Sequence, residues 1–245
     1  MLCLPKLALG RPDEAVKLCD EYLCTARQLD RPFALATALI AGALLRSQRR
    51  EPEAMRALAE ECITLAEEHG FNERLAEGRW FREWAISELG PTEQGVAELV
   101  ASVAGKTGFS RLIMALAIPQ LYMRVSRVDD ALGFIDEELA GIEQSGAHLQ
   151  EPELYGLKGE AILVRDSCAT AEAEACFRKA IEVARSQSAK WWELRATTSL
   201  ARLLAKQSRC DEARTMLAEI HGWFTEGLDT ADLKDAKALL DELSG

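Results

Sequence analysis

The sequence has little of what several kinds of catalytic or metal site require. It contains three histidines and seven cysteines, none of them spaced as HxxxH, HExxH or CxxC, and it has no GxSxG motif. Such spacings bring metal ligands, or a nucleophile and its base, into one place. We therefore expect no metal, no cofactor and no catalytic residue, and we expect that the protein is not an enzyme.

Positive charge and long apolar runs are also scarce. Lys and Arg number 29 against 40 Asp and Glu, which gives a net charge of −11. A nucleic-acid-binding surface needs an excess of basic residues, so we expect no nucleic-acid partner. No run of about 18 apolar residues could cross a bilayer. The start, MLCLPKLALG, lacks the basic leader and cleavage site of a signal peptide. An odd number of cysteines in apolar segments favours a reducing environment, so we expect a cytoplasmic protein with no membrane partner.

What the sequence does have is a repeated pattern. AEACFRKAIEVAR, Ala173 to Arg185, places a small residue, then a large ring four residues on, then a small residue after three more. A small residue followed four positions later by a large apolar residue recurs in six copies, 36 to 42 residues apart, which begin at Ala15, Ala54, Gly95, Ala131, Ala173 and Ala213. A period near 40 residues with two helices in each period is typical of an α-solenoid.

The pattern and its turns predict helix pairs over residues 1–245 as a single repeat domain. Prolines that open helices and acidic residues in first turns set the starts. The first helix of each pair is expected at 32–47, 72–89, 109–126, 151–165 and 189–207. The second is expected at 13–29, 53–69, 92–104, 128–144, 170–187 and 210–220. Residues 230–243 would form a capping helix. The predicted fold is all-α, a right-handed α-solenoid of about six pairs.

The spacing of small and large residues resembles a tetratricopeptide repeat (TPR). In that family a glycine or alanine of the first helix lies twelve residues before the leading small residue of the second. Gly42 and Ala201 match this rule, and Gly159 matches it only if two extra residues lie in the loop near Cys168. The small residue would let the two helices of a pair approach closely, and the ring of Phe177 would fill the space between one pair and the next.

Longer segments carry a more specific resemblance. EPELYGLKGEAIL, AEAEACFRKAIEVARSQSAKWWELRATTSLARLLAKQ, GWFTEGLDTADLKDAKALLDEL and WAISELGPTEQGVAEL resemble the C-terminal repeat region of large bacterial signalling ATPases, many of which carry a class III adenylate/guanylate cyclase domain. The resemblance implies a regulatory or scaffolding module whose partner could be its own upstream ATPase or cyclase domains.

The first repeat is truncated, because only MLCLPKLAL precedes its second helix. Either more protein precedes Met1, or this apolar start packs on another chain, which includes a second copy. The AGKTG segment around Lys106 has Val100 where a phosphate-binding loop needs glycine, so we expect no nucleotide site there.

In the TPR family the first helices line the concave surface, so their aromatic and basic residues are candidates for a partner groove. The aromatic candidates could instead belong to the core, and the arginines to solvated surface. The principal function hypothesis is binding of a protein or peptide. The alternative is a sensor that binds a small molecule or peptide in the groove. The candidate residues are Trp80, Trp84, Tyr122, Arg124, Trp191, Trp192, Arg195 and Arg202.

Overall fold

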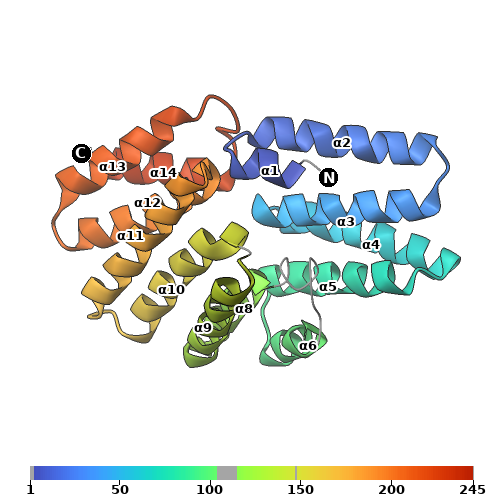
Figure 1. Ribbon diagram of the computed structural model, residues 1–245, viewed down its shortest axis with the longest axis horizontal. Coiled ribbons are helices and arrows are strands. Elements are labelled where there is room, and N and C mark those ends of the chain that lie inside the picture. Colours follow the sequence, from blue (N-terminus) through green and yellow to red (C-terminus); the bar gives the residue numbers. More distant parts are fainter. Residues whose placement is uncertain (1–2, 104–114, 147, 245) are drawn as a thin grey trace. The chain divides into compact units, whose positions relative to one another are not determined.

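The protein is all-helical, as the sequence predicts. The computed structural model describes residues 3–103, 115–146 and 148–244, and within these ranges it contains thirteen α-helices, one short 3-10 helix and no strand (Figure 1). The chain divides into two compact units. Unit 1 comprises Met1–Leu7 and Pro12–Leu121, and unit 2 comprises Ala8–Arg11 and Tyr122–Gly245. The expectation of one repeat domain over 1–245 stays a prediction.

Unit 1 is a series of helices in which each contacts the next. From α2 to α6, each helix packs on its successor, and α3 also contacts α5, so alternate helices meet (Figure 1). The helices are α1 (Cys3–Ala8), α2 (Pro12–Gln28), α3 (Pro32–Gln48), α4 (Pro52–His69), α5 (Asn72–Leu89) and α6 (Glu93–Val103).

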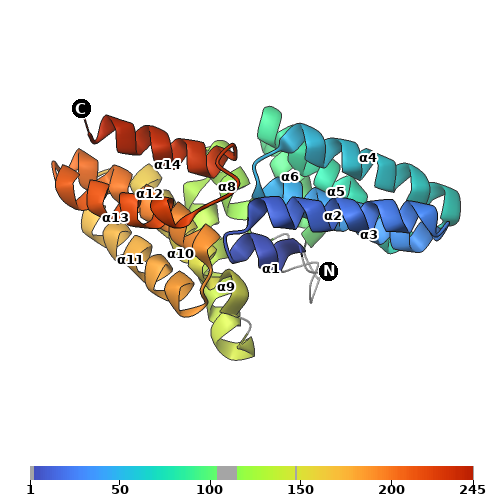
Figure 2. The same cartoon turned by 90° about the horizontal axis from the view of Figure 1, so that it is seen from above.

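Unit 2 continues the same sequential packing, and α8 (Ala117–Arg124) lies at its boundary with unit 1. Each helix from α9 to α14 contacts the next, and α12 also contacts α10 and α14. Figure 2 shows α14 lying along α12 and α13. The elements are α9 (Val128–Ser145), the 3-10 helix η1 (His148–Gln150), α10 (Glu151–Arg165), α11 (Thr170–Ser186), α12 (Lys190–Lys206), α13 (Cys210–Trp223) and α14 (Ala231–Glu242).

Most predicted helix bounds are confirmed within one to three residues. The expected helix at 109–126 is described only from α8 onward, and its first part, like Lys106, lies outside the described residues. Proline opens α2, α3 and α4 as expected. At such a position the missing proline N–H would have had no partner within the helix.

Several of the described helices end in the same turn. A residue in the left-handed region follows the helix, and the next N–H bonds to a carbonyl in the last turn. Gly70 takes the left-handed position after α4, with φ of 71°. After α12 a serine, Ser208, takes it at φ 64°, and the Arg209 N–H donates to the Leu204 carbonyl at 2.9 Å. Ser188 and Arg50 take the same position after α11 and α3, so the turn geometry recurs without glycine.

The small-and-large stripe forms the contact between the helices of a pair. Ala173 and Phe177 are buried on α11, and a Cβ added to Gly159 of α10 would lie only 2.6 Å from Cε1 of the Phe177 ring. In unit 1 the equivalent Gly42 faces Leu58, with 3.0 Å between the added Cβ and Cδ1. The expected contact of Gly159 with the second helix is therefore present, across the connection of residues 166–169. The Phe177 ring makes this contact within its own pair, whereas the sequence led us to expect it between one pair and the next.

We predict that Gly159→Ala destabilises the protein, because the new methyl group has to displace the buried Phe177 ring. Overpacking of a core contact costs about 1–3 kcal/mol. The midpoint of urea unfolding, read by circular dichroism, measures the change.

Gly156→Ala, one turn earlier on α10, is the matched control. No neighbouring atom lies within 4 Å of its added Cβ. Alanine stabilises a helix interior by about 0.5–1 kcal/mol over glycine, so the control should raise the midpoint. Equal midpoint shifts for the two variants would contradict the close contact.

Candidate functional site

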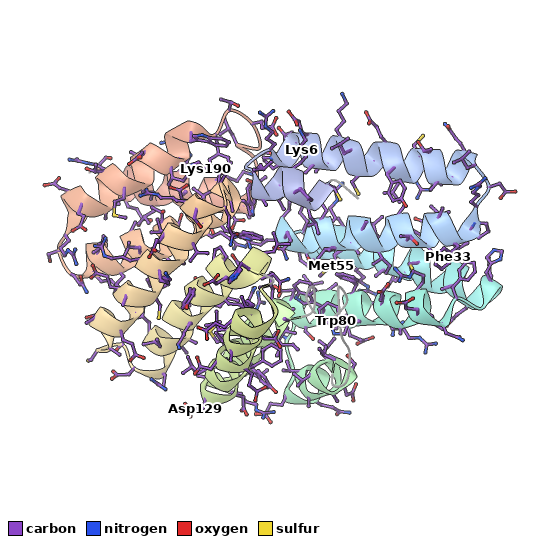
Figure 3. All side chains as sticks on the ribbon, in the orientation of Figure 1. Lys6, Phe33, Met55, Trp80, Asp129 and Lys190 are labelled. Carbon is purple, nitrogen blue, oxygen red and sulfur yellow. The ribbon has the colours of Figure 1, made fainter. Side chains whose placement is uncertain are left out.

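The two tryptophans of unit 1 that were candidates for either a groove or the core are buried in its core. Trp80 and Trp84 lie on α5, each 3% exposed, with ring centroids 5.1 Å apart (Figure 3 labels Trp80). The Phe81 ring lies against both of them. The indole N–H of Trp84 donates to Oε1 of Glu88 at 3.1 Å. Of the two alternatives for these rings, their burial supports packing between helices.

The aromatic candidates of unit 2 are buried as well. Trp191 is fully buried on α12, edge-on to Phe224 at 6.1 Å between centroids, and Trp192 beside it is 9% exposed. Tyr122 of α8 is buried under the guanidinium of Arg127, which lies 4.9 Å from the ring centroid. Desolvation raises the pKa of Tyr122, and the Arg127 charge opposes part of that rise. These rings, too, are members of the core.

The three candidate arginines differ from one another. Arg124 is exposed at the end of α8. The side chain of Arg202 is 49% exposed on α12, and its Nη2 lies 3.9 Å from Oδ2 of Asp235. For both residues the surface and groove alternatives remain. The side chain of Arg195 is 18% exposed and lies at the centre of an ion-pair cluster within unit 2.

Arg195 joins three helices through charge-assisted hydrogen bonds. Its Nη1 donates to Oε1 of Glu153 on α10 at 2.7 Å, and its Nε donates to Oδ2 of Asp232 on α14 at 3.0 Å. Both carboxylates belong to buried residues. Burial by itself would lower the pKa of Arg195, but the charges of Asp232 and Glu153 raise it. The guanidinium therefore stays charged and holds α10 and α14 to α12.

Helical spacing places further polar residues on the same side of these three helices. Glu160 follows Glu153 by seven residues on α10. Ser199 and Arg202 follow Arg195 by four and seven on α12, and Asp235 follows Asp232 by three on α14. Residues at such spacings share a helix face. We call this set the polar face: Glu153, Glu160, Arg195, Ser199, Arg202, Asp232 and Asp235. Only its arginines were candidates from sequence.

Glu160 is the carboxylate of the polar face with a raised pKa. It is exposed in area, and the Ser199 hydroxyl donates to its Oε1 at 2.7 Å. Desolvation by the surrounding protein nevertheless raises its pKa, with the Glu153 charge adding to the rise, while Ser199, Arg202 and Arg195 oppose it. An accessible side chain that is also desolvated has protein around it on several sides. Glu160 is thus a charge that the fold alone does not favour.

The acidic residues around Arg195 are ion-pair partners, and they do not form a metal-binding cluster among the described residues. Among residues 3–103, 115–146 and 148–244, no three His, Cys, Asp or Glu side chains lie together as a metal site would require. Glu153 and Asp232, the carboxylates nearest to Arg195, are bound to it as ion-pair partners. In the same part of the chain, no helix is both long and apolar enough to cross a membrane.

We predict that Arg195→Met costs about 3–5 kcal/mol of stability, because it leaves two buried carboxylates without their counter-charge. Arg202→Met removes an equal charge from the same helix, but the side chain of its partner Asp235 is 42% exposed, so the loss should stay below about 1 kcal/mol. Urea unfolding of both variants at neutral pH measures the difference. Similar losses for the two would show that the cluster does not hold the three helices.

We predict that Glu160→Gln stabilises the protein at neutral pH. A carboxyl group whose folded pKa lies above its ordinary value of 4.5 contributes stability below that value, and the contribution is lost as the pH rises through the folded pKa. Glutamine carries no charge and still accepts the Ser199 hydrogen bond. The melting temperature of the variant should therefore exceed that of the wild type at pH 8, and the excess should shrink toward pH 4.

Glu137→Gln, at an exposed position of α9, is the control for the loss of one negative charge. If its melting temperature follows the same pH profile as that of Glu160→Gln, the effect belongs to net charge and the desolvation of Glu160 is not its cause.

Comparison with protein families and with curated proteins found no match: no family model matches the chain, and no curated protein has a significantly similar sequence. The resemblance to TPR proteins and to the repeat region of signalling ATPases therefore stays a prediction.

Proposed function

We propose that this chain is a right-handed α-solenoid of about six TPR-like helix pairs with a capping helix, and that it is a non-catalytic module that binds a protein or peptide. Sequential pairing of adjacent helices supports the repeat architecture. So does the contact of a glycine in the first helix with a large residue in the second, at Gly42 and at Gly159.

The observation that carries the binding function is the polar face of unit 2. Helices α10, α12 and α14 are alternate helices, and α12 contacts both of the others. In a solenoid such helices line one side. Arg195 joins the three helices through Glu153 and Asp232, while Glu160 and Arg202 are exposed and Asp235 is partly exposed. A rigid helical scaffold with accessible charges of both signs suits a partner that is read by charge pairs, since complementary charges set specificity and orientation.

Within this proposal the module is the regulatory C-terminal region of a bacterial signalling ATPase or cyclase, and the ATPase or cyclase domain is its first candidate partner. Self-association through the apolar start is the other. Cys3 and Leu7 of that start are buried within unit 1, whereas Leu9 is 44% exposed. A second copy would therefore have to use Leu9 or another exposed side chain.

Photo-crosslinking tests the proposal. A benzophenone side chain placed at position 202 of the polar face should give one dominant adduct in cells, identified by mass spectrometry. The same group at Lys179 of α11, whose side chain is comparably exposed at 44%, is the matched control. Absence of an adduct at 202, or the same adducts at both positions, would contradict a partner surface on the polar face.

Glu160 favours a second candidate, the small-molecule sensor. A desolvated carboxylate gains from a cationic ligand, because the ligand supplies the counter-charge that water supplies elsewhere. A panel of polyamines and other amine metabolites should then raise the melting temperature according to RT ln(1 + [L]/Kd). The shift should disappear in Glu160→Gln. If no amine raises the melting temperature, the sensor candidate is contradicted and only the protein-binding proposal remains.

A further inference from the structure

A four-residue segment near the start of the chain belongs to unit 2, although the residues on either side of it belong to unit 1. This segment, Ala8–Arg11, leads from the end of α1 to the start of α2, and we call it the linker segment. Its residue Gly10 is buried, whereas Leu9 is 44% exposed. All other residues of unit 2 come from 122–245, so the linker segment meets them as a separate short peptide would.

Gly10 lies against a corner of unit 2 that two aromatic rings and one lysine form. Lys190 is the first residue of α12, Trp223 is the last residue of α13, and Phe224 follows it (Figure 3 labels Lys190). The Lys190 ammonium lies 5.8 Å from the centroid of the Trp223 ring, and the Phe224 ring stands edge-on to Trp223 at 5.3 Å. We call Lys190, Trp223 and Phe224 the aromatic corner.

The fit at Gly10 leaves no room for a side chain. An added Cβ would lie 2.5 Å from Cζ3 of Trp223, 2.9 Å from Cβ of Lys190 and 3.0 Å from Cε1 of Phe224. The Lys190 Cβ is attached to the backbone of α12, so a side-chain rotation cannot relieve that contact. The φ of Gly10 is 78°, a left-handed conformation that glycine adopts without steric cost. The aromatic corner therefore selects both the turn and the missing side chain of its occupant.

The aromatic corner also has the rigidity and the surface of a binding site. The Phe224 ring lies edge-on to the fully buried Trp191, and Nζ of Lys190 donates to Oε2 of Glu193 at 2.7 Å, so neighbours on α12 hold both side chains. Trp223 is 44% exposed even with the linker segment in place. Tryptophan rings that a partner covers are frequent hot spots of binding, and a preorganised surface loses little entropy when it binds.

We propose that the aromatic corner is a peptide-binding site for a glycine-containing turn, which the linker segment Ala8–Arg11 occupies as an intramolecular ligand. A partner peptide with a glycine in the left-handed conformation then has to displace the linker segment. A short tether gives an effective concentration of roughly 1 mM, so a free peptide of the same sequence should bind with a Kd below about 1 mM. None of these residues belongs to the polar face, so the two binding proposals can fail separately.

Fluorine NMR of the full chain, labelled with fluorotryptophan, is the test. Gly10→Ala should release the linker segment and shift the resonance of Trp223, which Trp223→Phe identifies by its loss. The resonances of Trp80 and Trp84, in the core of unit 1, should stay in place. The free peptide KLALGRPD, residues 6–13, should return the Trp223 resonance toward its wild-type position, with half of the effect below about 1 mM.

Gly70→Ala is the matched control. Gly70 has a φ of 71°, and no neighbouring atom lies within 4 Å of its added Cβ. It introduces the same backbone strain as Gly10→Ala without a clash, so the Trp223 resonance should not move. A peptide with alanine in place of its glycine should have no effect. An unshifted Trp223 resonance in Gly10→Ala, no response to the glycine peptide at about 5 mM, or an equal response to the alanine peptide would each overturn the proposal.

Photo-crosslinking with glycine kept at position 10 decides the question if Gly10→Ala fails to fold. A benzophenone side chain at the exposed position 9 should form an adduct with the tryptic peptide of residues 215–234, which contains Trp223 and Phe224. An excess of the free glycine peptide should reduce this adduct. Adducts only in other peptides, or an adduct that the excess leaves unchanged, would show that the aromatic corner does not hold the linker segment as a displaceable ligand.

Discussion

The ring of Phe177 rests on the backbone at Gly159, and this close approach sets how near the two helices of a pair can lie. A side chain larger than hydrogen at 159 would occupy the position of the ring. The same relation recurs in unit 1 between Gly42 and Leu58, where a neighbouring helix is also brought close by a missing side chain. Once the pairs have this spacing, the remaining apolar residues of each second helix meet the next pair. The small residue is thus the geometric condition for sequential packing.

The ion-pair cluster in unit 2 depends on that packing. Arg195 reaches Glu153 and Asp232 at the same time only because α10 and α14 both lie beside α12. Charges removed from water lose hydration energy, and good geometry has to offset the loss. One guanidinium with two carboxylates, all fixed by hydrogen bonds, meets that condition. The cluster therefore contributes more to the arrangement of the three helices than to net stability.

Sequence periodicity predicted the helices well, because apolar and small positions repeat with the helical period and proline or glycine marks many ends. It predicted the burial of the tryptophans only as one of two alternatives, since a ring on a first helix can face either a neighbour or solvent. The pairing of Arg195 was not predicted. Its partners lie 42 and 37 residues away, and such contacts depend on which helix faces meet. The left-handed serines, such as Ser208, also carry no strong sequence signal, because serine is common in many turns.

Two residues of the polar face, Arg195 and Glu160, differ in how the fold satisfies their charges. Arg195 donates hydrogen bonds to two buried carboxylates, so its role is to hold the three helices together. Glu160 is different, because desolvation disfavours its charge and only Ser199 donates a short hydrogen bond to it among the contacts described for it. In the proposed binding function, a partner that supplies a positive charge at Glu160 would offset the desolvation that raises its pKa, and the gain would appear as affinity.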